Sequence, residues 1–262
     1  MMYRIRVLSG LVAALTLVGS GMSNAKTPAD ALSFGTASVT YGPYLRAEAG
    51  LAFPNFADGH WLPTGYPIDP RVDFDLSGKR SGFAAIAVGY DWMNGFRGDI
   101  ALLNVGRSDV TGPHTTLGPH ADITSASVDT TAIMANLFYS PLEQLGRNSR
   151  LQPFFVVGIG LANNRVGDWT RTNTATTPVT RTYSGATHSD LALSLGVGMS
   201  YQLTPPGKYP VILELAYRYY RFGTAKGGST ADKGLSVPVE PLTFRNNAGI
   251  VSVGLRIPLN HL

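Results

Sequence analysis

The sequence predicts an all-β fold, an eight-stranded antiparallel transmembrane up-and-down β-barrel. The first observation is a period of two in short segments, which is typical of strands. Within residues 127–162, for example, Phe155, Val157 and Ile159 alternate with small residues. An apolar face opposite a small or polar one needs either a partner sheet or lipid, and a membrane barrel needs only lipid. The second observation is composition: 15% charged residues, 30 glycines and 12 tyrosines in 262 residues favour lipid-exposed strands with aromatic bands.

The third observation is the spacing of the alternating segments, which defines eight strands. The predicted strands are residues 42–53, 82–92, 96–106, 127–139, 151–162, 190–203, 210–222 and 249–259. Their connections alternate strictly between short and long, which is the plan of bacterial membrane barrels. In the first short connection, Asn94-Gly95 supplies the positive φ that a hairpin needs. The four long connections, at residues 54–80, 107–125, 163–187 and 223–246, carry no period and are predicted to be loops.

A secretory signal peptide is predicted at residues 1–25, followed by one barrel domain at 26–262. Arg4 and Arg6 precede an apolar run, and Ser23-Asn24-Ala25 offers small residues for cleavage. The alternative is a single spanning helix, for which the apolar run is short and interrupted by glycine and serine.

Charge and cysteine content exclude several classes of protein. The formal net charge of +4 falls to +2 without the two leader arginines, which is too weak to indicate nucleic-acid binding. The chain has no cysteine, so disulfides and thiol chemistry are excluded. No second long apolar segment indicates a helical membrane protein.

Seven charged residues fall on the inward face of the predicted strands, as a lumen charge network. They are Arg46, Glu48, Arg97, Asp99, Glu214, Arg218 and Arg256. The interior of an eight-stranded barrel is just wide enough for side chains to fill. Two interpretations follow, a small or gated pore and a plug of paired charges; burial forces such charges to pair. A soluble lipocalin-like barrel would place apolar side chains inside instead.

Five aromatic residues end the outward faces near the short turns and are predicted to form one interfacial girdle. They are Tyr90, Trp92, Phe96, Tyr139 and Tyr201.

Two further groups of residues have side chains of the kinds that bind metals or catalyse hydrolysis. His114, His120 and Asp122 in the second long connection could hold zinc or copper, and a polar loop explains them equally. His188-Ser189-Asp190 has the residue types of a hydrolytic triad, but neighbours on a strand point to opposite faces and cannot form a relay. We therefore predict neither a metal site nor a catalytic site.

Basic residues in the long connections are candidates for contact with lipopolysaccharide phosphates or acidic glycans. They are Arg165, Arg171, Arg181, Lys226 and Lys233, interleaved with Trp169 and Tyr183. Ordinary solvated loop charge is the alternative interpretation.

The chain resembles the small outer-membrane β-barrel family that includes opacity-type surface proteins and the transmembrane domain of outer-membrane protein A. The similarity covers nearly all of residues 26–262 and rests on the order of several short motifs. These are Val88-Gly89-Tyr90-Asp91, Asn94-Gly95-Phe96-Arg97, Met134-Ala135-Asn136, Phe138-Tyr139, Pro153-Phe154, Val157-Gly158-Ile159-Gly160, Tyr217-Arg218-Tyr219, Phe222-Gly223 and Gly254-Leu255-Arg256. The family often ends in an aromatic residue, which helps the barrel-insertion machinery recognise the chain; this sequence has Leu262 at that place.

The resemblance implies a surface protein of the bacterial outer membrane, exported through the periplasm, with a structural, adhesive or antigenic role and a plugged lumen. A narrow porin-like channel and a lipid A-modifying barrel enzyme are the alternatives; we predict no enzymatic activity and no cofactor. The implied partners are outer-membrane lipid, lipopolysaccharide, the insertion machinery and a host or surface ligand at the loops.

Overall fold

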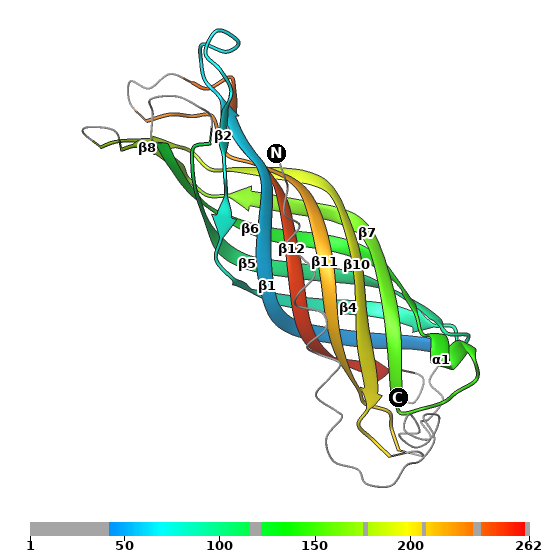
Figure 1. Cartoon of the computed structure of the whole chain (residues 1–262). Coiled ribbons are helices and arrows are strands. Elements are labelled where there is room, and N and C mark those ends of the chain that lie inside the picture. The colour runs from blue at the N-terminus through cyan, green and yellow to red at the C-terminus, as the bar shows by residue number, and fades with distance from the viewer. Residues whose placement is uncertain (1–41, 116–121, 175–177, 206–207, 233–236, 260–262) are drawn as a thin grey trace, which may run out of the picture. The chain divides into compact units, whose positions relative to one another are not determined.

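Eight long strands form a closed antiparallel ring (Figure 1). The computed structural model describes residues 42–115, 122–174, 178–205, 208–232 and 237–259. The ring strands are β1 (Gly42–Leu62), β4 (Ser81–Asp91), β5 (Phe96–Pro113), β6 (Asp122–Tyr139), β7 (Leu151–Val166), β10 (Ala186–Gln202), β11 (Ile212–Lys226) and β12 (Glu240–Pro258). Each pairs with the next along the chain, and β1 pairs with β12 to close the ring. The predicted fold class is confirmed. The predicted leader at 1–25 and the chain end at 260–262 lie outside the described residues.

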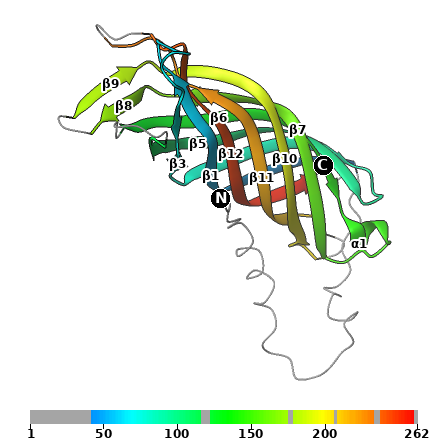
Figure 2. The ribbon, with the colours of Figure 1, turned by 45° about the horizontal axis from the view of Figure 1, so that its top comes forward.

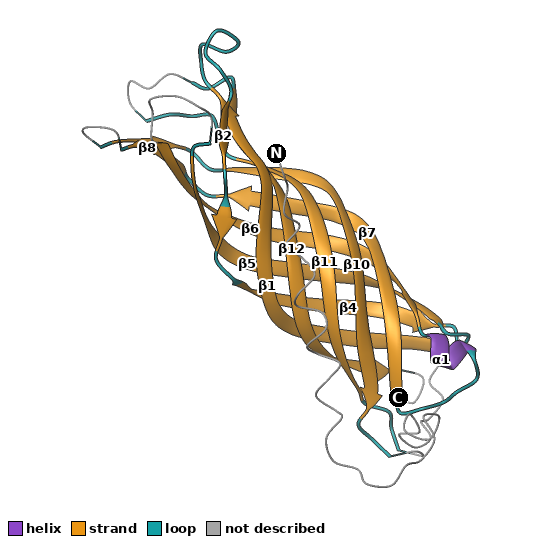
Figure 3. Ribbon diagram, viewed as in Figure 1, coloured by secondary structure: helices purple, strands orange, loops and turns teal. Residues whose placement is uncertain are grey.

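The pairing register sets the tilt of the strands. Following paired residues once around the ring leads from Leu45 through Val88, Ile100, Ala135, Ile159, Leu193, Arg221 and Asn247 back to Asn55. The path therefore returns to β1 ten residues further along. A stagger of this kind requires tilted strands, at roughly 35–45° to the axis in barrels of this type. Figure 3 shows the tilt of the strands.

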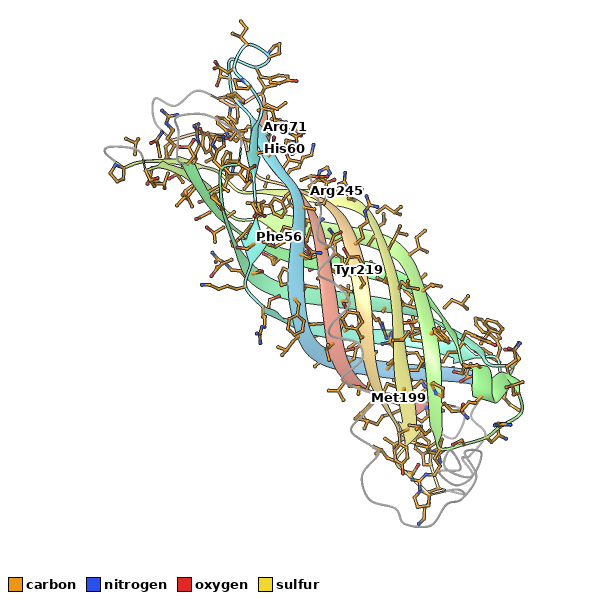
Figure 4. The ribbon with its side chains drawn as sticks, in the orientation of Figure 1. Phe56, His60, Arg71, Met199, Tyr219 and Arg245 are labelled. Atoms are coloured by element: carbon orange, nitrogen blue, oxygen red, sulfur yellow. The ribbon has the colours of Figure 1, made fainter. Side chains whose placement is uncertain are left out.

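Side chains alternate between the lumen and the outer surface along every ring strand. On β4, Ala85 and Ala87 are buried, whereas Ile86 is 63% exposed and Val88 60%. On β10, Leu191 to Met199 follow the same alternation, with Leu195 64% exposed. Together the exposed aliphatic and aromatic side chains form an apolar belt around the ring, and Figure 4 shows Met199 and Tyr219 on it. An apolar outer belt is the surface that lipid covers.

The short connections lie at one end of the barrel, here named the short-turn end. Gly95 has φ +84° and Met93 has φ +60°, so the turn takes its second positive φ at Met93 and not at Asn94. Asn94 instead accepts a hydrogen bond through Oδ1 from the Phe96 amide at 3.1 Å. Between β6 and β7 lies the single-turn helix α1 (Pro141–Gln144). No helix among the described residues is long and apolar enough to cross a membrane.

The prediction that the four long connections are loops is wrong over much of their length. Ring strands β1, β5, β6, β7, β11 and β12 run well past the apolar belt at the opposite, long-loop end. Four short strands join them: β2 (Val72–Phe74), β3 (Ser77–Gly78), β8 (Trp169–Asn173) and β9 (Val179–Tyr183). Figure 2 shows β8 and β9 side by side at this end.

An apolar cluster inside the long-loop end explains why these strands continue. It includes Phe56 and Phe244, whose rings lie 5.1 Å apart, and Trp169, which stacks on Tyr183 at 4.1 Å. Beyond the belt the outward residues face water, so they need not be apolar. The sequence therefore shows no period of two there, although the strands remain paired. The inward residues still bury apolar surface, which stabilises the extension.

Candidate functional site

The strongest candidate site is the lumen, where all seven predicted inward charges are buried. They occupy the half of the lumen nearer the short-turn end, on β1, β5, β11 and β12. Arg46 Nε lies 2.9 Å from Asp99 Oδ2, and Arg46 also pairs with Glu48. Arg218 Nη1 lies 3.2 Å from Glu48 Oε1. These contacts join four of the residues into one network.

Glu214 and Asp91 belong to a second group of ion pairs, which meets the first at the ring of Phe138 and completes the network. Glu214 Oε1 lies 2.5 Å from Arg97 Nη1 and 2.9 Å from Arg256 Nε. The second contact of Arg256, through Nη1, is with Asp91 Oδ2 at 3.2 Å. Sequence reasoning missed Asp91, although the signal was present: Ile86, Val88 and Tyr90 point outward, so position 91 points inward. With Asp91 included, four arginines face four carboxylates, and the network carries no net charge.

Neutral side chains satisfy further atoms of the network. Asp99 accepts hydrogen bonds from Asn136 Nδ2 at 2.7 Å and from the Tyr44 hydroxyl at 3.2 Å. The Ser252 hydroxyl donates to Glu48 Oε2 at 3.1 Å. Because buried charges require such partners, the arrangement is typical of a fixed polar plug.

Phe138 fills the space between the arginines. The guanidinium carbons of Arg97, Arg46 and Arg218 lie 4.3, 5.3 and 5.4 Å from the centre of its ring. Cation–π attraction is strongest where the cation is desolvated. One buried aromatic ring therefore spaces three like charges that would otherwise repel one another.

Apolar and amide layers follow the charges toward the long-loop end. First comes an apolar layer that includes Phe83 and Tyr220, with ring centres 6.3 Å apart. Next, Asn246 Nδ2 donates to Thr130 Oγ1 and Asn164 Oδ1, each at 2.9 Å. Beyond it lies the apolar cluster of the long-loop end. Side chains thus occupy the lumen at successive levels.

A polar cavity of about 260 Å³ opens at the short-turn end, lined in part by Asp91, Glu143, Arg150 and Arg256. Burial raises the pKa of the Glu143 carboxyl above its usual range, and the negative charge of Asp91 raises it further. The neighbouring Arg256 acts in the opposite direction without cancelling the shift. The cavity therefore makes the charged form of Glu143 less favourable than it is in water.

The five predicted girdle aromatics lie at the short-turn end of the outer surface. Tyr90 and Trp92 have ring centres 6.3 Å apart, and Phe96 and Tyr139 have ring centres 5.0 Å apart. Tyr201 lies under the Arg150 guanidinium, at 5.1 Å. Two adjacent pairs and a separate tyrosine thus line one edge of the apolar belt.

Neither of the other predicted constellations forms a reactive cluster in the described part of the chain. His114 has its ring 6.3 Å from that of Phe74, Asp122 pairs with Arg171, and His120 lies outside the described residues. No group of metal-binding side chains occurs among the described residues. Ser189 is exposed on the outer face, while Asp190 accepts hydrogen bonds from the Thr224 and Leu191 amides at 2.8 and 2.7 Å.

The basic residues of the long connections have mixed surroundings. Arg171 is held by Asp122 and lies 4.7 Å from the Trp61 ring. Lys226 Nζ pairs with Glu240 at 3.3 Å. Arg165 and Arg181 are exposed, and Lys233 lies outside the described residues. Trp169 and Tyr183, which lie among these basic residues in the sequence, are buried in the apolar cluster and do not share their exposure.

Comparison with known proteins finds similarity at the level of structure. No family model matches the sequence, and no curated protein matches it. Neisserial surface protein A is 16% identical, with 83% of this chain and 97% of that chain covered and a TM-score of 0.46. The outer-membrane protein OprG from Pseudomonas aeruginosa is 13% identical, covering 84% and 98%, with a TM-score of 0.48. The outer-membrane protease OmpT from Escherichia coli is 9% identical, covering 85% and 99%, with a TM-score of 0.46.

Breaking the charge network is expected to destabilise the barrel strongly. Glu214→Gln leaves Arg97 and Arg256 with one fewer buried counter-charge, which costs about 3–5 kcal/mol of unfolding free energy. Asp109→Asn is the matched control, because Asp109 pairs with Lys79 on the surface, where such pairs contribute about 0–1 kcal/mol. Urea unfolding in detergent micelles measures both changes. Equal losses in the two variants contradict the assignment of Glu214 to a buried network.

The raised pKa of Glu143 predicts a pH dependence of stability. Its folded pKa lies above the unfolded value, so its contribution is fully present below the unfolded pKa and is lost as pH rises through the folded pKa. Thermal unfolding of the wild type and Glu143→Gln should therefore show the larger fall with rising pH in the wild type. Identical pH profiles would show that Glu143 does not titrate differently in the folded state.

Proposed function

We propose that this chain is an outer-membrane surface protein with a non-conducting lumen and a structural, adhesive or antigenic role. The observation that carries the proposal is the stack of side-chain layers in the lumen: charges, an apolar layer, an amide layer and a second apolar cluster. The apolar belt suits a bilayer, and strands that extend past the belt suit display outside the cell. Proteins of this fold class differ in role, because function depends on sites that the fold does not specify.

The two alternatives each lack support from the described residues. A narrow channel needs a continuous polar path, whereas the layer with Phe83 and Tyr220 is apolar. A lipid A-modifying enzyme needs a catalytic group on or near the outer face. His188, Ser189 and Asp190 do not provide one, because Ser189 points away from the face shared by the other two.

Planar-bilayer recording tests the closed lumen. We expect the refolded protein to produce no unitary conductance steps, with a known porin added to the same bilayer as a positive control. Because several layers fill the lumen one after another, removing one of them with Tyr220→Ala should still produce no unitary conductance. Tyr219→Ala on the outer face should produce none either. Unitary steps from the wild type would replace this proposal with the narrow-channel alternative.

Single-cysteine labelling tests the orientation, since the chain has no cysteine of its own. Ile68 is 93% exposed at the long-loop end and Leu145 is 72% exposed at the short-turn end. We expect a membrane-impermeant maleimide to label Ile68→Cys on intact cells, and Leu145→Cys only after the outer membrane is permeabilised. The reverse pattern would invert the orientation, and labelling of both on intact cells would argue against a membrane-spanning barrel.

A further inference from the structure

An apolar groove of about 720 Å³ lies on the outer face of the ring, over β1, β4 and β5. The short side chain of Ala47 is flanked by Ile86 on β4 and Leu255 on β12, its paired neighbours. The groove is also lined by Leu102 and Ile133. Its shape and its position in the apolar belt suit a hydrocarbon chain, which packs by van der Waals contact in a setting without water.

From this groove toward the long-loop end, the outward residues of β4 are small: Ala84 and then Gly82. Ala49 pairs with Ala84, and Leu51 pairs with Gly82. A Cβ atom added at Gly82 would meet nothing within 4 Å, so no other part of the described chain covers this position. Six residues of strand, about 20 Å, separate Ile86 in the groove from Arg80.

Arg80 and Arg107 stand at the end of this path, where the apolar belt gives way to polar residues. Both are exposed, and neither makes an ion pair with another described residue. The Arg80 guanidinium lies 5.5 Å from the ring centre of Phe53. The segments that carry the two arginines are joined, because the hydroxyl of Ser108, next to Arg107, donates to the carbonyl of Lys79, next to Arg80, at 2.7 Å.

The opposite side of the ring lacks this pattern. At the corresponding end of the belt, β6, β7 and β10 present Thr131, Asn163 and Ser189 in paired outward positions. Two single exposed arginines lie further along this side: Arg165, whose backbone partner on β6 is Asp129, and Arg221 on β11, whose backbone partner on β10 is Leu193. Exposed arginines on two joined segments therefore lie at the end of the path that leads from the groove.

We propose that this face binds one lipid A molecule of the outer leaflet, with a phosphate on Arg80 and Arg107 and an acyl chain in the groove. Guanidinium groups pair with phosphate through two parallel hydrogen bonds. The chemistry thus requires an anionic head and a hydrocarbon tail in one molecule, oriented with its head toward the long-loop end. The inference rests on the proposed outer-membrane location.

Native mass spectrometry of the refolded full-length mature chain in detergent, titrated with bis-phosphorylated lipid A, tests the site. We expect one saturable lipid, and Arg80→Gln/Arg107→Gln should weaken its binding at least about tenfold, because charged hydrogen bonds contribute most per contact. Gly82→Leu/Ala84→Leu, which fills the path, should weaken it as well. Dephosphorylated lipid A should bind the wild type and the arginine variant equally and weakly.

Matched controls use the other side of the ring: Arg165→Gln removes one charge and Ser189→Leu adds the same side chain to an exposed position. We expect neither to change lipid A binding. Equal weakening by these controls, or phosphate-independent binding, overturns the proposal. So does a wild-type dimer that Ala84→Leu dissociates, because a second copy then occupies the groove.

Heat-dependent gel mobility establishes that each variant is folded before titration. The cysteine-labelling pattern reports the membrane location independently of lipid A. If labelling supports the location and lipid A binding is absent, the lipid site alone is wrong. If the labelling pattern contradicts the outer-membrane location, the proposed function is wrong as well.

Discussion

The constraint on which the whole structure depends is that a backbone in hydrocarbon must satisfy its own hydrogen bonds. A sheet can do so only by closing on itself, which it does where β1 meets β12. Closure with eight strands and a stagger of ten residues fixes the width of the interior. An interior of that width holds side chains and little else, so the inward residues must pack against one another. The outward residues need only be compatible with lipid.

Charged side chains fill part of that interior, and their burial requires partners. An arginine in a narrow, dry lumen is costly unless a carboxylate and further hydrogen-bond partners accompany it. The network supplies four of each charge, with Tyr44, Asn136 and Ser252 at the edges. Some buried nitrogen atoms of Arg46, Arg97 and Arg218 have no hydrogen-bond partner among the described residues. Phe138 separates three of the arginines. Such a network ties together β1, β4, β5, β11 and β12, which are distant in the sequence, and so fixes how they face one another.

Because side chains fill the lumen, the surfaces that can contact other molecules are the outer face and the long-loop end. The long-loop end is stabilised by its own apolar cluster around Trp169 and Phe244, so it is a structured extension of the barrel. The apolar belt on the outer face is not uniform. It has a groove over β4 and exposed arginines at one edge. Both features depend on the outward face, which the sheet closure leaves free to vary.

The sequence by itself determined the ring: eight strands, their order and which residues face lipid, because a period of two is a local property that lipid exposure makes visible. It also placed Arg46, Glu48, Arg97 and the other inward charges on the face that the structure buries. Only the tertiary structure decided which charge meets which, that Asp91 belongs among them, and how far the strands continue past the belt. Those outcomes depend on register and on packing between strands far apart in the chain. Beyond the membrane, where water replaces lipid, the outward residues no longer need to be apolar, and the local pattern ceases to report the strand.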